Sequence, residues 1–289
     1  MSEIHEWEKW GRQDPYFAVI TDPRYRSANL TEEAKKVFFD SGRHHARAVL
    51  AECRHRVDPK FKPRRVLDFG CGVGRVVLAF AAEAEAVVGV DVSPAMIEEA
   101  RRNCEAHGLS NVELQVSDDE LSQLSGGFDL VHSCIVFQHI DVVTGRQLFR
   151  RLLELLAPGG IAALHITYGK AYHADRFGQP PTPPPASAAA DASPEAASGI
   201  GNPGTLKSIG RWMARGAPRT VIEALPGRVQ RLADPQMNMN PYNLSELAFL
   251  MQSAGIKRFH ADFTDHGGEL GVFLYFSKPP LPKPAANPA

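Results

Sequence analysis

A glycine-rich segment, VLDFGCGVGR, lies at Val66–Arg75 and could form a ligand-binding loop. Gly70, Gly72 and Gly74 alternate in it, directly after an apolar run that contains Asp68. Glycines at a strand-to-helix turn let the backbone bend tightly and let a ligand approach the main chain closely. The segment therefore predicts a small-molecule site at the end of a buried strand.

Two acids indicate which ligand this loop receives. Asp91 ends the next apolar run, in VVGVDVS, where an acid is placed to accept two hydrogen bonds from a ribose diol. Asp68 places a carboxylate beside the loop, which would repel a pyrophosphate and attract a ligand that carries an ammonium and a sulfonium. The third glycine of a dinucleotide fingerprint would fall on Arg75 instead. S-Adenosylmethionine is the ligand that meets these conditions.

A parallel sheet must position these residues. Apolar runs of strand length alternate with amphipathic segments, which is the pattern of a parallel sheet covered by helices on both faces. We predict strands at residues 65–69, 86–90, 112–116, 128–133 and 161–167. We predict helices at residues 73–82, 94–107, 118–124 and 144–156. Strands joined by right-handed crossovers in this order make a doubly wound α/β domain.

The flanking regions complete the organisation of the chain. Acids after Thr31 favour a helix start there, and Ser41-Gly42 predicts a break before the helix resumes to Val57. We assign residues 1–42 to an N-terminal arm and helix, 43–168 to the core, 169–242 to an acceptor-side insertion, 243–277 to a C-terminal helix with an antiparallel strand pair at 256–263 and 270–276, and 278–289 to a disordered tail. Residues 179–204 hold seven prolines and almost no large apolar side chain, which predicts a flexible loop.

Composition excludes several classes of protein. The 289 residues are 44% hydrophobic and 22% charged, as in a globular protein, and the net charge of −1 provides no global field for nucleic acid or an anionic membrane. The first residues lack a signal peptide's basic start, and no apolar run reaches the ~18–20 residues of a membrane span. Four cysteines lie too far apart for a disulfide scaffold or a zinc ribbon. We therefore expect a cytoplasmic protein with no metal site.

Six segments in order resemble the class I S-adenosylmethionine-dependent methyltransferases. They are VLDFGCGVGR, VVGVDVS, VELQVSDDEL, FDLVHSCIVFQHI, LLAPGGIAAL and NLSELAFLMQSAGI. The resemblance covers roughly residues 43–164 and 242–276. It implies a Rossmann-like, seven-stranded and mostly parallel sheet with an antiparallel edge pair, and an enzyme that uses S-adenosyl-L-methionine as methyl donor.

The resemblance also assigns the cofactor contacts. Gly70, Cys71 and Gly72 would line the methionine end, beside the carboxylate of Asp68. The other contacts that it implies are Asp91 at the ribose, Val92 and Met96 beside the adenine, Asp118 or Asp119 at the adenine amine, and Ser133 and Cys134 closing the pocket. The family usually has glycine before the adenine-facing acid, whereas this chain has serine, so either acid could take that role.

Three residues after the fourth and fifth predicted strands could handle a proton. A hydroxyl acceptor benefits from a base with a pKa near the working pH, and histidine is the default. His139 lies six residues beyond the fourth strand, on the ligand side, and is the first candidate for the catalytic base. Tyr168 and His173 are the alternatives. His165 lies inside the fifth strand and is interpreted as a core histidine.

The chain lacks motifs that mark several classes of methyltransferase, which restricts the kinds of acceptor to expect. Amino-directed base methyltransferases carry [DN]-P-P-[YFW] after the fourth strand, where this chain has Ser133-Cys134-Ile135-Val136. No proline precedes Cys134, which excludes the cytosine-carbon enzymes. Eight Lys and Arg residues at 43–65 could contact RNA but fit a solvated helix face better. We expect a small-molecule acceptor methylated at a hydroxyl oxygen, with nucleic acid and membrane disfavoured; a macromolecular acceptor (RNA or protein), or a non-catalytic binding module, stays open, as does the oligomeric state.

Overall fold

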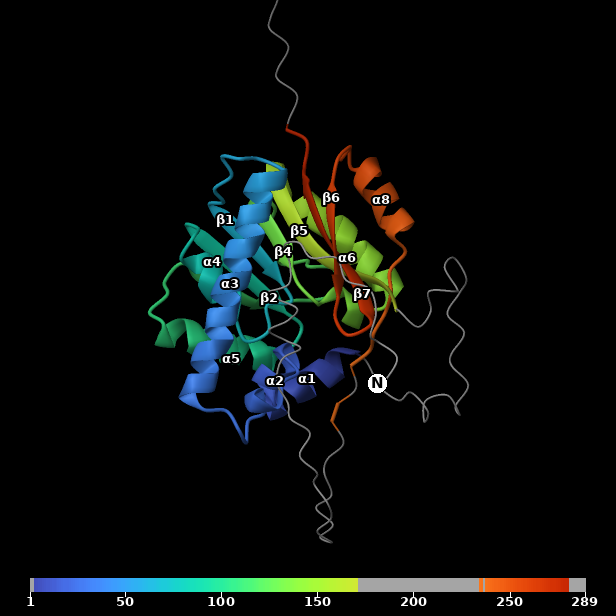
Figure 1. The fold of residues 1–289 in the computed structure, drawn as a ribbon. Helices are drawn as coiled ribbons and strands as arrows, with labels where there is room; N and C mark the ends of the chain where they lie inside the picture. The colour runs from blue at the N-terminus through green and yellow to red at the C-terminus, as the bar shows by residue number, and fades with distance from the viewer. Residues whose placement is uncertain (1–2, 171–233, 236, 281–289) are drawn as a thin grey trace, which may run out of the picture.

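The computed structural model describes residues 3–170, 234–235 and 237–280. Within them, seven strands form one sheet in the order β3-β2-β1-β4-β5-β7-β6 (Figure 1). The strands are β1 (Arg65–Phe69), β2 (Ala86–Asp91), β3 (Val112–Val116), β4 (Phe128–Ser133), β5 (Leu156–Lys170), β6 (His260–Asp265) and β7 (Glu269–Ser277). The first five pair in parallel, and β6 and β7 form an antiparallel edge. The predicted Rossmann-like, doubly wound fold is confirmed.

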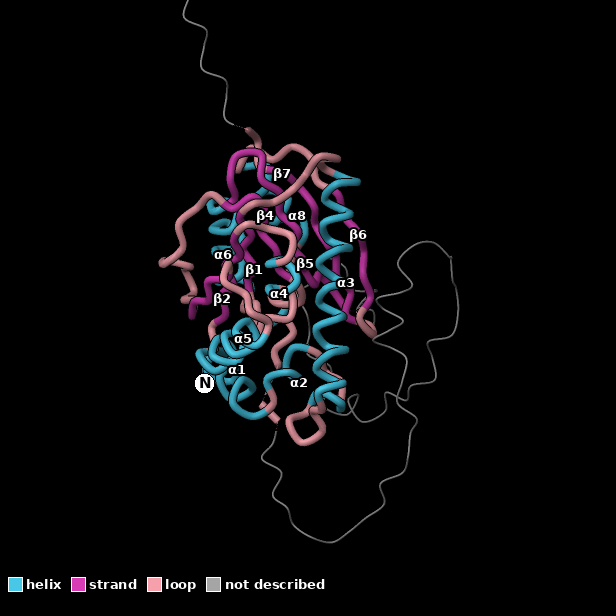
Figure 2. Tube along the Cα trace, turned by 90° about the vertical axis from the view of Figure 1, so that its left-hand side faces the viewer, coloured by secondary structure: helices cyan, strands magenta, loops and turns pink. Residues whose placement is uncertain are grey.

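Helices cover both faces of the sheet (Figure 2). They are α3 (Glu32–Arg56), α4 (Val77–Ala81), α5 (Pro94–Ala106), α6 (Val142–Leu155) and α8 (Leu244–Ser253). Val66 and Val87 belong to one buried apolar cluster with side chains of α3, α4 and α5, whereas their neighbours Leu67 and Val88 belong to another with α6 and α8. Successive side chains of a strand point to opposite faces, so each face has its own core.

Two helices begin where the sequence places a capping side chain. Ser93 Oγ accepts a hydrogen bond from the N–H of Met96 at 3.2 Å, and Thr31 Oγ1 accepts one from the N–H of Ala34 at 3.1 Å. Each bond satisfies a backbone donor that the first helical turn leaves unpaired. The start of α5 is thereby fixed three residues after Asp91, the last residue of β2.

The predicted break in the first long helix is wrong. α3 runs without interruption through Ser41-Gly42. A Cβ on Gly42 would collide with the carbonyl group of Arg75, so the glycine serves a close approach between α3 and the glycine loop. The predicted boundary between residues 42 and 43 therefore falls inside one helix that belongs to both the arm and the core.

The helix predicted at residues 118–124 is also wrong, because the segment forms turns. Asp118 Oδ1 accepts hydrogen bonds from the N–H groups of Glu120 and Ser122 at 3.1 and 2.9 Å. Such side-chain bonds offer the backbone an alternative to helical hydrogen bonding. Leu121 follows with a φ of 52°, which a helix does not accommodate.

The N-terminal arm consists of α1 (Glu3–Gln13), α2 (Pro15–Val19) and the 3₁₀ helix η1 (Pro23–Tyr25). Its buried aromatic side chains, among them Trp10, Tyr16 and Tyr25, pack in one cluster with Met96 of α5. The arm therefore lies against α5 at one end of the sheet (Figure 1). No helix in the described part of the chain is both long and apolar enough to span a membrane.

Candidate active site

A cavity of about 1000 Å³ lies at the carboxyl ends of the parallel strands. Its wall combines the loops after β1, β2, β3 and β4 with residues 18–25 of the arm and with Met237 and Met239. The predicted cofactor residues found in this wall are Asp68, Gly70, Cys71, Gly72, Asp91, Val92, Met96, Asp118, Asp119 and Cys134. Ser133 is fully buried in β4 and does not line the cavity. The structure thus brings ten of the predicted side chains and loop positions to one cavity.

The glycine loop is held by β2. The N–H groups of Gly70 and Cys71 both donate to the carbonyl oxygen of Val90 at 2.9 Å. Gly70 and Gly72 have φ values of 73° and 52°, in the left-handed region that disfavours other residues. A Cβ on Gly70 would also collide with the side chain of Val136. The loop therefore presents bare backbone to the cavity.

Asp91 is fixed by backbone donors on both of its oxygens. Oδ2 accepts a hydrogen bond from the N–H of Gly72 at 2.9 Å, and Oδ1 accepts one from the N–H of Ser93 at 3.0 Å. Burial raises the pKa of this carboxyl to about 6, because it disfavours the charged form more than these bonds favour it. Each oxygen has a further lone pair, so ligand hydroxyls that donate to it would stabilise the charge.

The two acids after β3 differ in what they bind. Asp118 accepts hydrogen bonds from the side chain and the N–H of Ser122, and these bonds lower the pKa of its carboxyl. Asp119 is exposed, and its carboxylate has no hydrogen-bond partner among the described residues. Both line the cavity, and Asp119 has the freer oxygens for a ligand's amino group.

Asp68 belongs to a buried chain of side chains that the sequence analysis missed. His132 Nδ1 donates to Asp68 Oδ1 at 2.7 Å, and His132 Nε2 lies 2.9 Å from His45 Nε2. Asp68 and His132 are 4% and 1% exposed, and both line the cavity. Burial, with His132 beside it, lowers the pKa of His45 well below its usual range, so the hydrogen-bond network assigns a neutral His45 that donates to His132. A histidine within the apolar run of β4 was the only signal in the sequence.

His139 lines the cavity with its ring held on two sides. Its Nδ1 donates to the carbonyl oxygen of Asn238 at 2.8 Å, and its ring packs edge-on against Trp7 with centroids 4.9 Å apart. Its Nε2 faces the amide nitrogen of Gln138 at 3.2 Å. Burial lowers the pKa of His139. The ring is therefore neutral at neutral pH, and the lone pair on Nε2 accepts a hydrogen bond from the amide of Gln138.

The other candidates for proton transfer lie elsewhere. Tyr168 is outside the cavity wall and packs edge-on against Phe263, with ring centroids 5.8 Å apart. His165 is 1% exposed, and its Nε2 lies 3.0 Å from Thr264 Oγ1, as expected of a core histidine. Burial lowers the pKa of His165 to about 3. His173, the loop at residues 179–204 and most of the predicted tail lie outside the described residues.

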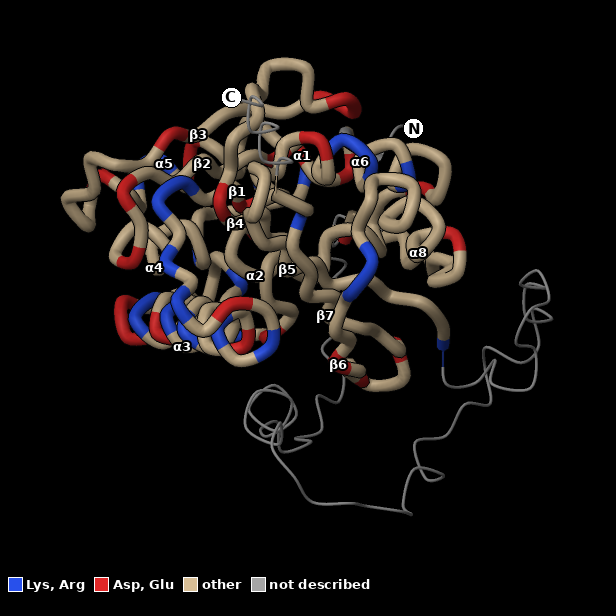
Figure 3. Tube along the Cα trace, turned by 90° about the horizontal axis from the view of Figure 1, so that it is seen from above, with Lys and Arg blue, Asp and Glu red and all other residues tan. Residues whose placement is uncertain are grey.

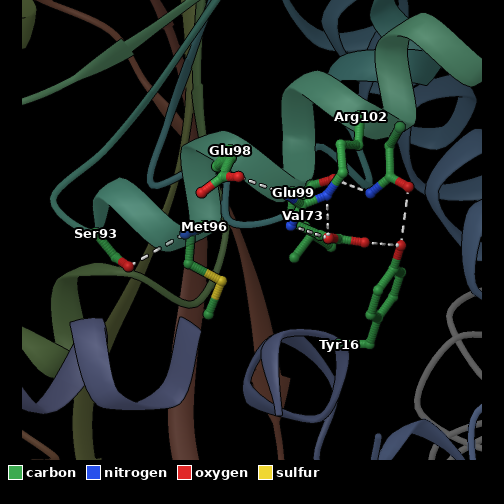
Figure 4. Close-up of polar contacts among 8 residues, drawn as sticks. Tyr16, Val73, Ser93, Met96, Glu98, Glu99 and Arg102 are labelled. Carbon is green, nitrogen blue, oxygen red and sulfur yellow. Dashed lines mark hydrogen bonds and ion pairs between the residues drawn. The ribbon is translucent and has the colours of Figure 1, made fainter. Parts of the chain in front are cut away.

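Polar contacts fasten the arm to α5. The hydroxyl of Tyr16 donates to Glu99 Oε1 of α5 at 2.7 Å (Figure 4). Glu8 Oε2 accepts hydrogen bonds from Ser93 Oγ at 2.8 Å and from the N–H of Ala95 at 3.1 Å. Because these contacts join residues more than 80 positions apart, sequence patterns gave no indication of them. They place the arm as one wall of the cavity.

Some basic residues of α3 form ion pairs with acids. Lys and Arg alternate with Asp and Glu along this helix (Figure 3). Arg56 contacts Glu52 at 3.0 Å and Asp262 at 3.2 Å, and Arg43 is paired with Asp40. Neither arginine lines the cavity. These ion pairs engage two of the eight Lys and Arg residues at 43–65.

Comparison with known proteins fits this geometry. Residues 66–160 match the family model described as "Methyltransferase domain". The chain contains a class I S-adenosylmethionine-dependent methyltransferase domain. The matched span runs from the glycine loop to β5, and so contains β1 to β4 and the loops that line the cavity.

Two curated relatives share this methyltransferase domain. A trans-aconitate 2-methyltransferase from Methylobacterium radiotolerans is 34% identical over 167 residues, which cover 56% of this chain and 57% of that protein. A ribosomal protein L11 methyltransferase from Pasteurella multocida is 29% identical over 130 residues, or 44% of this chain and 41% of that one. The chain thus spans about half the length of the curated relatives it matches.

Two solved structures share the fold over almost the whole chain. The N-methyltransferase NodS from Bradyrhizobium japonicum WM9 aligns with a TM-score of 0.53 at 12% identity, covering 96% of this chain and 100% of that chain. A magnesium protoporphyrin IX methyltransferase from Synechocystis PCC 6803 aligns with a TM-score of 0.55 at 16% identity, with the same coverage. At these identities the likeness concerns the fold alone.

Proposed function

We propose that this protein transfers a methyl group from S-adenosylmethionine to a hydroxyl oxygen of a small-molecule acceptor. The observation that carries the proposal is one cavity in which bare glycine backbone is flanked by the carboxylates of Asp68, Asp91 and Asp119. A positively charged nucleoside ligand would satisfy all three acids, whereas a pyrophosphate would be repelled by them. The domain family supports the same ligand.

The residues in the cavity wall fit this cofactor. Asp91 would accept hydrogen bonds from the ribose, Val92 and Met96 would flank the adenine, and Asp68 would face the ammonium with the oxygen that His132 leaves open. Gly70 and Gly72 leave room for the methionine part. When bound, the cofactor supplies an electrophilic methyl group on a positively charged sulfur.

The chain's own residues would then orient the acceptor and remove its proton. The arm and Met237 wall the cavity and would limit water there. His139 Nε2 carries a lone pair because Nδ1 donates to Asn238. The amide of Gln138 donates to this lone pair at 3.2 Å, and an acceptor hydroxyl would take the place of that amide to give up its proton. A cavity walled by the arm favours a small acceptor over a residue of a folded protein. One curated relative acts on trans-aconitate, a small molecule, which supports this choice.

Binding and turnover test the proposal separately. Calorimetry should give binding of S-adenosylhomocysteine and none of NAD, and the reverse result would exclude the proposed cofactor. A screen for homocysteine release across sugars, phenols, organic acids and nucleosides would identify the acceptor. Release only with a protein or RNA acceptor, or with none, would favour the two alternative functions.

His139→Gln then tests the base. We expect turnover to fall by about 10²–10⁴-fold, while S-adenosylhomocysteine affinity changes by less than about threefold because His139 lies outside the predicted cofactor contacts. His55→Gln, at an exposed position of α3, is the matched control and should keep full turnover. Full turnover of His139→Gln between pH 6 and 9 would contradict the assignment and leave positioning alone to account for the rate.

A further inference from the structure

Among the residues that the structure describes, two polar groups in the cavity wall lack hydrogen-bond partners. Arg75 Nε is buried with no hydrogen bond to any of these residues, and the guanidinium has one long contact with them, from Nη1 to Ser41 Oγ at 3.3 Å. The hydroxyl of Tyr25 is also buried with no partner in this part of the chain, and this side chain is 1% exposed. Both residues line the cavity. Unsatisfied donors of this kind are rare in proteins and require a physical account.

The two side chains are held by tertiary packing. Arg75 follows the glycine loop, and its backbone and Cγ contact the space left by Gly42 of α3. The ring of Tyr25 packs edge-on against Phe38 of α3, with centroids 5.2 Å apart. Residues of α3 thus contact both side chains. The donors are therefore preset on one wall.

The charge on Arg75 is the unusual element. Other arginines near the arm are neutralised: Arg24 pairs with Asp22 at 2.9 Å, and Arg26 with Asp14 at 2.8 Å. Among the described residues, no carboxylate lies within ion-pair distance of Arg75, and Asp68 acts on it only through longer-range attraction. A buried cation without a contacting anion is unfavourable. A ligand anion that enters the cavity would remove this cost.

We propose that Arg75 and Tyr25 form a binding site for a carboxylate of the ligands that enter this cavity. A guanidinium presents two parallel N–H groups that match the two oxygens of a carboxylate, and the Tyr25 hydroxyl supplies a third donor. The inference rests on the proposed function, since both the methionine part of the cofactor and an acidic acceptor carry a carboxylate. The two sources share one chemistry and are separated by experiment.

Calorimetry with two nucleosides distinguishes the sources. S-Adenosylhomocysteine carries a carboxylate, and 5′-methylthioadenosine is a related thionucleoside without one. If the cofactor supplies the anion, Arg75→Gln should weaken the binding of S-adenosylhomocysteine by about 10–100-fold, as for loss of a hydrogen bond to a charged group. The affinity for methylthioadenosine should then stay unchanged. If the acceptor supplies it, both nucleosides should bind as in the wild type, and the variant should lose binding of tricarballylate or citrate to the protein saturated with S-adenosylhomocysteine.

Tyr25→Phe should act on the same ligand as Arg75→Gln but more weakly. Arg56→Gln is the matched control, because this arginine lies outside the cavity wall and already pairs with Glu52, and its effect should be much smaller. The melting temperature of the free protein gives an independent reading. Arg75→Gln should keep or raise it, because an uncompensated buried charge is removed, whereas a purely structural arginine would lower it.

Three results would overturn the site. The first is that Arg75→Gln binds S-adenosylhomocysteine, tricarballylate and citrate as tightly as the wild type does. The second is that the wild type binds neither tricarballylate nor citrate, while the substitution leaves both nucleoside affinities unchanged. The third is an equal loss for both nucleosides together with a lower melting temperature. Failure of the proposed function looks different, because neither nucleoside would then bind the wild-type protein.

Discussion

Protonation of Asp91 should control cofactor affinity below neutral pH. Burial raises the pKa of this carboxyl to about 6 in the free protein, and its two oxygens already accept N–H groups of Gly72 and Ser93. Ribose hydroxyls would donate to the charged form, so binding favours loss of the proton. Affinity for S-adenosylhomocysteine should therefore be constant above pH 7 and fall by about tenfold, or about 1.4 kcal/mol, per pH unit well below 6.

Asp91→Asn isolates this titration. The amide has one donor group facing two backbone donors, so it loses one hydrogen bond and the charge for the ribose. At pH 7.5 we expect the variant to bind S-adenosylhomocysteine more weakly than the wild type by about 1–3 kcal/mol. Its affinity should lack the pH dependence between pH 5 and 8 that titration of Asp91 causes in the wild type. The curves of wild type and variant should approach each other near pH 5, where the wild-type carboxyl is also neutral.

Calorimetry at half-unit steps of pH, with S-adenosylhomocysteine as ligand, measures both curves. Melting temperatures at each pH show whether the variant is folded. Parallel curves for the two proteins would refute the reasoning, because the titrating group would then be one other than Asp91. An affinity of Asp91→Asn equal to the wild type at pH 7.5 would refute the ribose contact itself.

Two further predictions concern stability. Burial holds the folded pKa of His165 near 3, below its ordinary value of 6.5, so its neutral form stabilises the fold above pH 6.5 and this contribution is lost as pH falls from 6.5 towards 3. Urea unfolding should give a stability that declines over this window in the wild type and declines less in His165→Gln; equal slopes would contradict it. Gly42→Ala should lower the unfolding free energy by about 1–3 kcal/mol, because its Cβ meets the carbonyl of Arg75. Arg43→Ala, at the adjacent exposed position, should change it by less than about 0.5 kcal/mol, and an equal effect of both would contradict the close packing.

The sheet could be predicted because its signals are local. Each parallel strand is a short apolar run between turn residues, and β1, β3 and β4 have the predicted bounds. Capping by Ser93 and Thr31 is likewise a local hydrogen bond within one turn. The errors arose where a distant segment or a side chain decided the backbone. Gly42 breaks no helix because Arg75, 33 positions away, occupies the space that its missing side chain leaves.

In the site, too, the features with local signals were predicted and those that depend on distant contacts were not. The glycine loop and Asp91 follow from strand ends that parallel pairing brings to one edge, so their spacing in the sequence was sufficient. The roles of individual side chains depended on contacts across the fold. Asp118 and Asp119 are neighbours of the same type, and the bonds of Asp118 to Ser122 separate them.

The position of Asp68 was predicted from the sequence, but the contacts that orient its carboxylate were not. The sequence analysis placed this carboxylate beside the glycine loop, ready for a cation, and the structure adds His132 and His45 behind it. A hydrogen bond from His132 fixes one oxygen of Asp68 and the orientation of its carboxylate. The direction of the other oxygen therefore depends on His132 of β4 and His45 of α3 as well as on β1. Substitutions in α3 should therefore affect the cavity, although no residue of α3 lines it. The contact between His45 and His132 couples this helix, which also supports Arg75 and Tyr25, to the acid that would face the cofactor's ammonium.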